Sequence, residues 1–136
     1  MDASQSTKRA VETDGAAPPI GPYSQGLVAD GVLYCSGQVP LDPSTHELVE
    51  GGIAGQAQRC LEALDAICAA AGTRLSDAAR IGIYLTDMSQ FPEVNEVYGG
   101  YFSEPFPART TIGVAALPKA ALIEMDAIVP LGPDSD

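Results

Sequence analysis

The sequence predicts an α+β domain in which one mixed sheet of about six strands carries two helices on one face. The chain has 136 residues, which fits one domain and leaves no room for two separate cores. Short stretches of alternating apolar residues, typical of strands, surround two longer stretches with apolar residues at helical spacing. Hydrophobic residues make up 46% of the chain but Trp is absent, so the core must consist mainly of Ala, Val, Ile and Leu.

The first elements follow an N-terminal segment without hydrophobic periodicity. Residues 1–17 are rich in Ser, Thr, Ala and charge, and we expect them to form a disordered tail. Two strands are predicted at 24–29 and 32–36. A tight hairpin turn should join them, because the dipeptide Asp30-Gly31 tolerates positive φ angles.

Two rounds of helix and strand are predicted next, after a polar turn and a short strand around Leu48. A helix is expected over 53–71, because apolar residues recur there at helical spacing and Gly72 provides a stop. Alternating apolar residues at 81–85 predict a strand. Apolar and aromatic positions between 91 and 102 predict a second, shorter helix.

Two more strands are predicted to close the domain, at about 109–115 and 122–129. The order is then β-β-β-α-β-α-β-β within a single domain of residues 18–130, followed by a C-terminal tail of residues 131–136. Two helices can cover only one face of such a sheet. The other face therefore needs a partner, and an oligomer is expected.

The charge of the chain argues against nucleic acid as a partner. Eighteen acidic and seven basic residues give a formal net charge of -11, which repels a polyanion on average. Nucleic-acid binders usually carry a basic patch or stripe, whereas the basic residues here are scattered apart from one pair in the tail. No apolar stretch has the length of a membrane span and the N-terminus is polar, so we expect a cytoplasmic protein without a membrane partner.

The residue inventory also argues against a metal centre or a cofactor. The three cysteines form no C-x-x-C pair, so neither a disulfide framework nor a zinc site is expected. His46 is the only histidine and follows a polar turn, which disfavours a Ser-His-Asp triad or a multi-histidine site. Because no phosphate-binding glycine motif is present, a nucleotide cofactor is not expected either.

Two charged residues near the C-terminus are candidates for chemistry. Arg109 opens a strand, a position suited to binding a carboxylate. Glu124 interrupts an apolar run, where a carboxylate is costly unless it is partnered or used. If the last two strands form a hairpin, Arg109 and Thr111 share a face with Glu124 and Asp126, and a register slip of one residue would separate them. On spacing alone, a structural Arg–Glu pair and an active site both remain open.

Five short motifs occur in an order and spacing that a known family shares. They are Gly21-Pro22-Tyr23-Ser24-Gln25, Ser36-Gly37-Gln38, Asn95-Glu96-Val97-Tyr98, Pro107-Ala108-Arg109 and Leu117-Pro118-Lys119. In these motifs, and in Glu124 after the last of them, the chain resembles the RidA/YjgF family, also called the L-PSP endoribonuclease family. The resemblance covers about residues 17–130. It implies a chorismate-mutase-like fold, a homotrimer whose sheets line a central barrel, and active sites in clefts between neighbouring subunits.

The resemblance also implies roles for individual residues. Arg109 matches the arginine that binds the substrate carboxylate, and Glu124 matches the carboxylate that positions or activates water. The family's other pocket residues are matched by Tyr23, Ser36 and Asn95. Many relatives carry a cysteine where this chain has Thr111, whose backbone groups could still serve. The implied activity is the cofactor-free hydrolysis of reactive 2-imino acids, such as 2-iminopropanoate and 2-iminobutanoate, to 2-oxo acids and ammonia.

Two other functions remain open at this point. Part of the resembled family is named for a ribonuclease activity, against which the acidic composition of the chain weighs. A non-catalytic trimer that binds a small carboxylate in the same cleft would also use Arg109. Only Glu124 favours turnover over binding alone.

Overall fold

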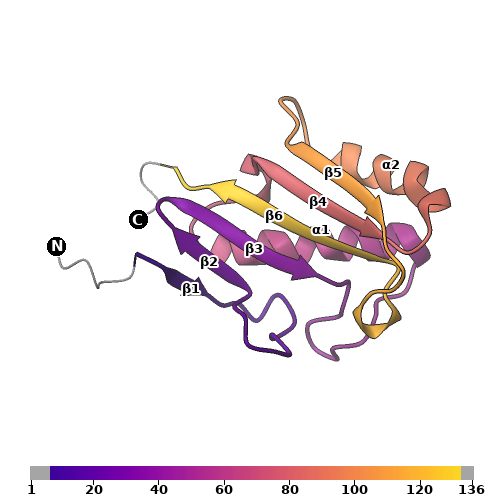
Figure 1. Ribbon diagram of the computed structural model, residues 1–136, viewed down its shortest axis with the longest axis horizontal. Coiled ribbons are helices and arrows are strands. Elements are labelled where there is room, and N and C mark those ends of the chain that lie inside the picture. The colour runs from indigo at the N-terminus through magenta and orange to yellow at the C-terminus, as the bar shows by residue number, and fades with distance from the viewer. Residues whose placement is uncertain (1–6, 133–136) are drawn as a thin grey trace.

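Two α-helices pack against one face of a six-stranded mixed sheet (Figure 1). The structure, a computed structural model, describes residues 7–132. The strands are β1 (Arg9–Val11), β2 (Gly26–Ala29), β3 (Val32–Gln38), β4 (Arg80–Leu85), β5 (Ala108–Gly113) and β6 (Ile123–Pro130), and the helices are α1 (Gly52–Ala70) and α2 (Phe91–Tyr101). The α+β fold class that the sequence predicts is confirmed.

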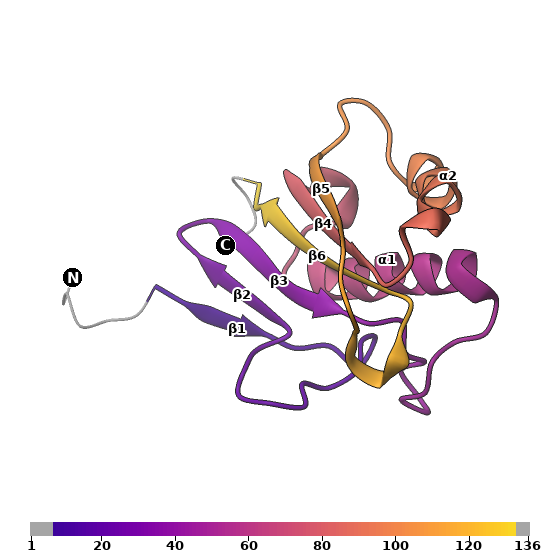
Figure 2. The ribbon, with the colours of Figure 1, turned by 45° about the vertical axis from the view of Figure 1, so that its right-hand side comes forward.

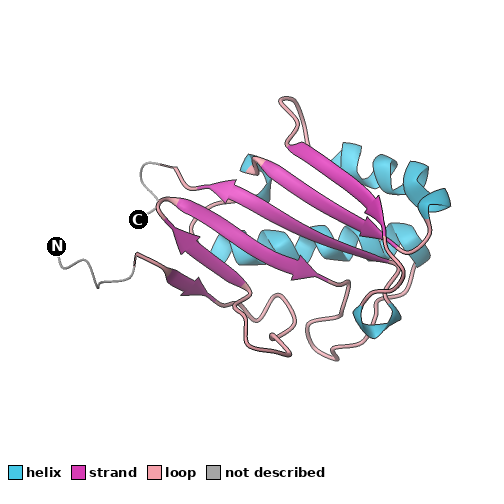
Figure 3. Cartoon of the chain, in the orientation of Figure 1, coloured by secondary structure: helices cyan, strands magenta, loops and turns pink. Residues whose placement is uncertain are grey.

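The strands lie in the order β1-β2-β3-β6-β4-β5. Every neighbouring pair is antiparallel except β4 and β5, which are parallel. A parallel pair needs a crossover connection, and α2 provides it between these two strands. Figure 3 shows the resulting layer of strands with both helices on the same side of it.

The predicted hairpin between the last two strands is wrong, because β4 lies between β5 and β6. The burial of the two strands explains their places. Four residues of β6 are buried in strict alternation, whereas five of the six residues of β5 are exposed. The more apolar strand therefore occupies the centre of the sheet, and the more polar one forms its edge.

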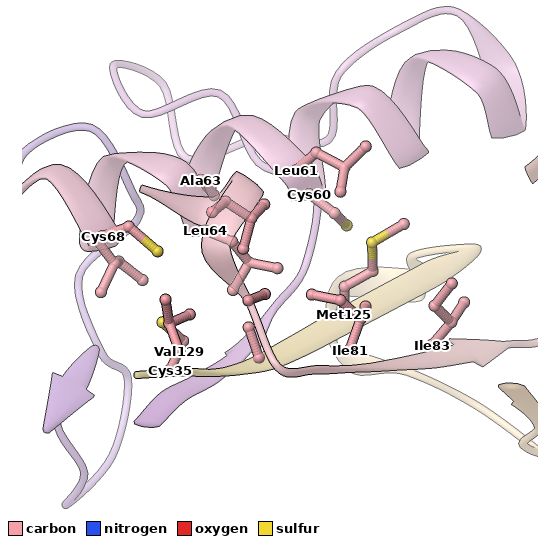
Figure 4. Close-up of a cluster of buried hydrophobic side chains, with 14 of the residues drawn as sticks. Cys35, Cys60, Leu61, Ala63, Leu64, Cys68, Ile81, Ile83, Met125 and Val129 are labelled. Carbon is pink, nitrogen blue, oxygen red and sulfur yellow. The ribbon is translucent and has the colours of Figure 1, made fainter. Parts of the chain in front are cut away.

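The core lies between α1 and the sheet (Figure 4). Leu61, Leu64 and Ile67 of α1 are fully buried, as are Ile83 of β4 and Met125 of β6. The three cysteines are also buried there as free thiols, as expected of small hydrophobic side chains. No helix within residues 7–132 is long and apolar enough to cross a bilayer.

The expected N-terminal tail needs correction, because part of it belongs to the sheet. Residues 9–11 form β1, which pairs with β2, and Val11 is buried. Only one of these three residues is buried, so the sequence has no alternating apolar pattern that would predict the strand. Residues 1–6 of the predicted tail lie outside the described residues.

Two smaller predictions also differ from the structure. The expected strand around Leu48 is reduced to a single bridge between Leu41 and Leu48. Leu131, expected in the C-terminal tail, packs against the core and its N–H donates to the carbonyl of Gly31. The last four residues, 133–136, lie outside the described residues.

The second face of the sheet carries no helix within residues 7–132, as Figure 2 shows from the side. Tyr34 and Ile112 are 45% and 44% exposed on it, together with the polar side chains of Tyr84 and Asp126. Large exposed apolar side chains that share a face often indicate a contact surface. This open face, as we call it below, includes the side chain of Glu124.

Candidate functional site

A pocket of about 440 Å³ opens beside the C-terminal end of β3 and the start of β6. Its walls come from the segment 17–25, the loop that contains His46, the turn at 118–119 and the end of β3. Three of the residues singled out from the sequence line it, namely Tyr23, Ser36 and Glu124. Three of the five motifs therefore meet at this pocket together with Glu124, although about a hundred residues separate Tyr23 from Glu124 in the chain.

Glu124 brings a half-buried carboxylate to this pocket. Burial is the main cause that raises the pKa of Glu124 above its usual range, and the negative charge of Asp126 is the second. Gly37 makes room for the carboxylate, because a Cβ at that position would collide with it. The register of β3 against β6 shifts between Cys35 and Gln38, so Gly37 lies in the irregular stretch beside the carboxylate.

Ser36 and Tyr23 are fixed by local hydrogen bonds. The hydroxyl of Ser36 donates to the carbonyl of Ser24 at 2.6 Å, and its N–H donates to the carbonyl of Gln25 at 2.9 Å. The hydroxyl of Tyr23 accepts a long bond of 3.4 Å from the N–H of Ile20. Because Tyr23 is 48% exposed, its ring remains available to a ligand or to another chain.

Gln25 holds the segment that forms the outer wall of the pocket. Its buried side chain accepts from the N–H of Thr13 at 2.7 Å and donates to the carbonyls of Thr13 and Ala17 at 3.1 and 2.9 Å. A buried amide with all of these bonds satisfied rigidifies its surroundings. The glutamine of the Gly-Pro-Tyr-Ser-Gln motif thus shapes the pocket wall through these hydrogen bonds.

Two pocket residues were missed by the sequence reasoning. Lys119 and His46 both line the cavity, and both have a left-handed backbone with φ of 62°. Lys119 lies in the Leu-Pro-Lys motif, which was a usable signal. His46 lies in a turn closed by local hydrogen bonds, such as the 2.8 Å bond from its N–H to the carbonyl of Asp42, but no local pattern shows that this turn lies against the pocket.

A second group of predicted residues lies at the other end of the sheet, between β5 and α2. The Arg109 guanidinium carbon is 4.8 Å from the ring centroid of Tyr98 and 5.4 Å from that of Phe91. Such distances are those of cation–π contacts. Asn95 falls between Phe91 and Tyr98 at helical spacing, so it shares their face of α2. Arg109 has no ion-pair partner within residues 7–132 and can therefore receive an anion.

Polar atoms without partners surround this arginine. The side-chain oxygens of Gln90, Tyr98 and Thr111 are buried and have no hydrogen-bond partner within residues 7–132. Buried polar groups are normally satisfied, and exceptions often occur at functional sites. Burial raises the pKa of Tyr98, so its hydroxyl remains neutral and able to donate.

Arg109 and Glu124 do not share a face, which corrects the sequence prediction. Arg109 is paired with Ile81, whose side chain is buried under the helices, whereas Glu124 is paired with Tyr84 on the open face. Thr111, which is paired with the buried Ile83, points to the helix side as well. The registers of β4 with β5 and with β6, together with the alternation of side chains along strands, place the two residues on opposite faces. A structural Arg109–Glu124 pair within one chain is therefore excluded.

The predicted site thus divides into two groups. The pocket group contains Tyr23, Ser36 and Glu124. The arginine group contains Asn95, Arg109 and Thr111. No cluster of three or more potential metal ligands occurs in the described part of the chain.

Comparison with known sequences gives a consistent set of relatives. The family model described as Endoribonuclease L-PSP matches residues 14–131. A RutC family protein from Pyrococcus horikoshii is 46% identical over 121 residues, which cover 89% of this chain and 96% of that protein. The human 2-iminobutanoate/2-iminopropanoate deaminase is 41% identical over 126 residues, with 93% and 92% covered.

Solved structures agree with the sequence comparison. A putative endoribonuclease from Thermotoga maritima superposes with a TM-score of 0.87 at 45% identity, covering 91% of this chain and 98% of that one. TdcF from E. coli, solved with bound serine, gives a TM-score of 0.85 at 33% identity, with 91% and 99% covered. Both cover nearly the whole of each chain, so the likeness extends over the complete fold.

Proposed function

The chain belongs to the RidA/YjgF family, and on that basis we propose that it hydrolyses reactive 2-imino acids to 2-oxo acids and ammonia. Relatives that are 40% and 41% identical bear the name 2-iminobutanoate/2-iminopropanoate deaminase. The observation that carries the proposal is that Arg109 and Glu124, one in each group, both lack an ion-pair partner within residues 7–132. Arg109 can bind a carboxylate, and Glu124 can accept and donate a proton.

The active site is composite in this proposal, because one chain cannot bring its two groups together. The arginine group of one subunit meets the pocket group of a neighbour, and the open sheet faces turn towards one another in a homotrimer. Tyr34 and Ile112 support this arrangement, since they expose apolar surface on the open face. The exposed β5 edge, which carries Arg109, can also approach another chain.

The assembly leads to a first prediction. In dilute solution, light scattering should give a mass of about three times the 14.0 kDa of the chain. A ring of three copies is closed by heterologous interfaces, in which one surface of each chain meets a different surface of the next chain. A stable monomer would remove the shared cleft and with it the composite site.

The chemistry requires few groups. Arg109 holds the substrate carboxylate through two parallel N–H donors, which orients the neighbouring C=N bond. As the oxygen of water adds to the imine carbon, Glu124 accepts a proton from the water and returns it to the nitrogen, which gives a neutral carbinolamine. The hydroxyl of the carbinolamine then gives its proton to the nitrogen through Glu124, the C–N bond breaks, ammonia leaves and the C=O bond forms. A pKa raised by burial makes Glu124 a better base near neutral pH than an exposed carboxylate.

Glu124→Gln provides the test that separates catalysis from binding. Turnover should fall by roughly a hundredfold or more, because positioned general-base help is typically worth about 10² to 10⁴. Affinity for a 2-oxo acid product should change little, since Arg109 is intact. Ammonia release from freshly generated 2-iminopropanoate measures the first quantity, and calorimetry with pyruvate measures the second.

The same assay distinguishes the proposal from a binding function. A protein that binds pyruvate but releases no ammonia faster than the spontaneous reaction would be a carboxylate-binding trimer. A variant Glu124→Gln with the turnover of the parent would contradict the role of Glu124 while leaving the imine substrate in place. Each variant should first be shown to have the parent's assembly mass.

A further inference from the structure

A polar cluster on the open face adjoins the pocket but is not part of its lining. The hydroxyl of Tyr84 on β4 donates to Oδ2 of Asp126 on β6 at 2.7 Å. Arg80 places a guanidinium nitrogen 3.6 Å from the other oxygen of the same carboxylate. Gly82 lies directly across from Asp126. A Cβ on Gly82 would collide with the Asp126 carboxylate and lie 2.9 Å from the Tyr84 hydroxyl, so the glycine keeps this space open.

This cluster is adjacent to Glu124 in two directions. Tyr84 is the cross-strand partner of Glu124, and Asp126 follows Glu124 by two residues on the same face of β6. Gly37 makes room for the carboxylate of Glu124 in the same way as Gly82 does for that of Asp126. Two glycines on the strands flanking β6 thus leave space for two neighbouring carboxylates.

Other charged or titratable groups also face Glu124. From the pocket walls these are Tyr23, His46 and Lys119. From α1, the buried thiol of Cys60 lies within electrostatic range of Glu124, whose charge contributes to raising the pKa of that thiol. The neighbouring charge that raises the pKa of Glu124 is that of Asp126, which acts in addition to burial.

We propose that Tyr84 and Asp126 are positioning residues for Glu124: the Tyr84 hydroxyl fixes the Asp126 carboxylate beside Glu124, and this fixed negative charge makes Glu124 a stronger base for the attacking water. The inference rests on the proposed hydrolysis of imines and adds to it the groups that adjust its proton acceptor. Neither residue touches the substrate in this scheme.

The negative charge of Asp126 should raise the pKa of Glu124 and so strengthen it as a base. A like charge nearby disfavours ionisation of a carboxyl group and raises its pKa, and a base of higher pKa accepts a proton from water more readily. The hydrogen bond to Asp126 raises the pKa of Tyr84, so the phenol keeps the proton that it donates. Arg80 contacts the other oxygen of the same carboxylate at 3.6 Å and so helps to hold Asp126 in place.

A purely structural role for the cluster is the alternative. The strands β4 and β6 are already joined by a continuous register of six residue pairs, from Arg80 with Ile128 to Leu85 with Ile123. One side-chain hydrogen bond adds little to the stability of such a ladder. Removing it should therefore leave the fold intact, and a change in pH dependence would identify the positioning role.

The experiment is the pH profile of kcat for ammonia release from 2-iminopropanoate. Activity should decline at acid pH as Glu124 becomes protonated. In Asp126→Asn this acid limb should move to lower pH, because the variant lacks the charge that raises the pKa of Glu124, and the plateau kcat should fall roughly threefold as the base weakens. KM should remain within about twofold of the parent, since Arg109 is untouched.

Two further variants and a matched control sharpen the test. Tyr84→Phe, which lacks a single oxygen atom, should move the limb in the same direction by a smaller amount. Gly82→Ala should displace the Asp126 carboxylate without changing any charge, and it should therefore also shift the acid limb of the pH profile. Asp77→Asn, in the exposed Arg74–Asp77 pair at 3.4 Å, alters the net charge equally but should leave the profile unchanged.

The outcomes separate this proposal from the one on which it rests. If Glu124→Gln keeps the acid limb, Glu124 is not the base and the proposed mechanism fails. If Glu124→Gln removes the limb but Asp126→Asn shifts it no more than Asp77→Asn does, the positioning role is overturned and the mechanism stands. Should Asp126→Asn fail to assemble, Tyr84→Phe decides, because an unmoved limb in that variant overturns the proposal.

Discussion

Arg109→Lys is expected to lose most imine hydrolysis even though the positive charge is kept. A lysine ammonium cannot reproduce the planar two-donor contact with a carboxylate. Loss of one hydrogen bond to a charged group costs about 1.5 to 3 kcal/mol, which corresponds to a fall of roughly ten- to a hundredfold in kcat/KM. The contacts with the rings of Tyr98 and Phe91 should also weaken, because they match a guanidinium better than a compact ammonium.

Steady-state kinetics with 2-iminopropanoate measures this loss, and Arg74→Lys is its matched control. Arg74 belongs to an exposed ion pair, with a side chain that is 75% accessible, so the same exchange there should leave kcat/KM unchanged. Arg74→Lys should unfold at the temperature of the parent, and Arg109→Lys at the same temperature or slightly below it, because its contacts with the two rings weaken. Parent-like turnover by Arg109→Lys would show that bidentate binding of the carboxylate is not what the arginine contributes.

The helices and their buried faces were predictable because their signals are local. In α1 the fully buried residues recur at helical spacing over about three turns, for example Ala57, Leu61, Leu64 and Cys68. The short strand β1 was not predictable by the same reasoning. Its three residues contain one buried position, and they pair with residues of β2 that are 15 to 19 positions away, from Val11 with Gly26 to Arg9 with Val28.

The neighbours of the last two strands in the sheet could not be predicted either, because strand order depends on contacts between residues far apart in the sequence. The alternation in β6 correctly shows that Glu124 and Asp126 share a face. It does not show which strand lies beside β6. A hairpin with β5 is the nearest choice in sequence, whereas the structure inserts β4 between them, and this single change places Arg109 on the opposite face.

The candidate site residues were predicted from sequence motifs, and a motif does not show which residues lie close together in the folded chain. Tyr23, Ser36 and Glu124 do meet in one pocket. Arg109 lies with α2 on the other side of the sheet. A composite site explains why both sets of motifs are needed in one chain, and this explanation can be tested without a structure of the assembly.

Mixing two inactive variants is expected to restore activity. Arg109→Ala lacks the carboxylate-binding group but keeps the pocket group, and Glu124→Ala has the opposite defect. If each active site takes its arginine from one subunit and its glutamate from the next, a mixed trimer contains some complete sites. Random assembly from equal amounts should make roughly a quarter of the sites complete, so refolded mixtures should recover about that share of the parent's ammonia release.

The control for this experiment is a chain that carries both substitutions. Mixed with Arg109→Ala, the double variant can supply no arginine, so no site is complete and no activity should return. Mass spectrometry of differently tagged chains establishes that mixed trimers have formed in both cases. If mixed trimers of Arg109→Ala and Glu124→Ala form and remain inactive, the two groups do not act on one substrate. Because the sheet separates Arg109 from Glu124 within a chain, that result would leave only one of them in the active site.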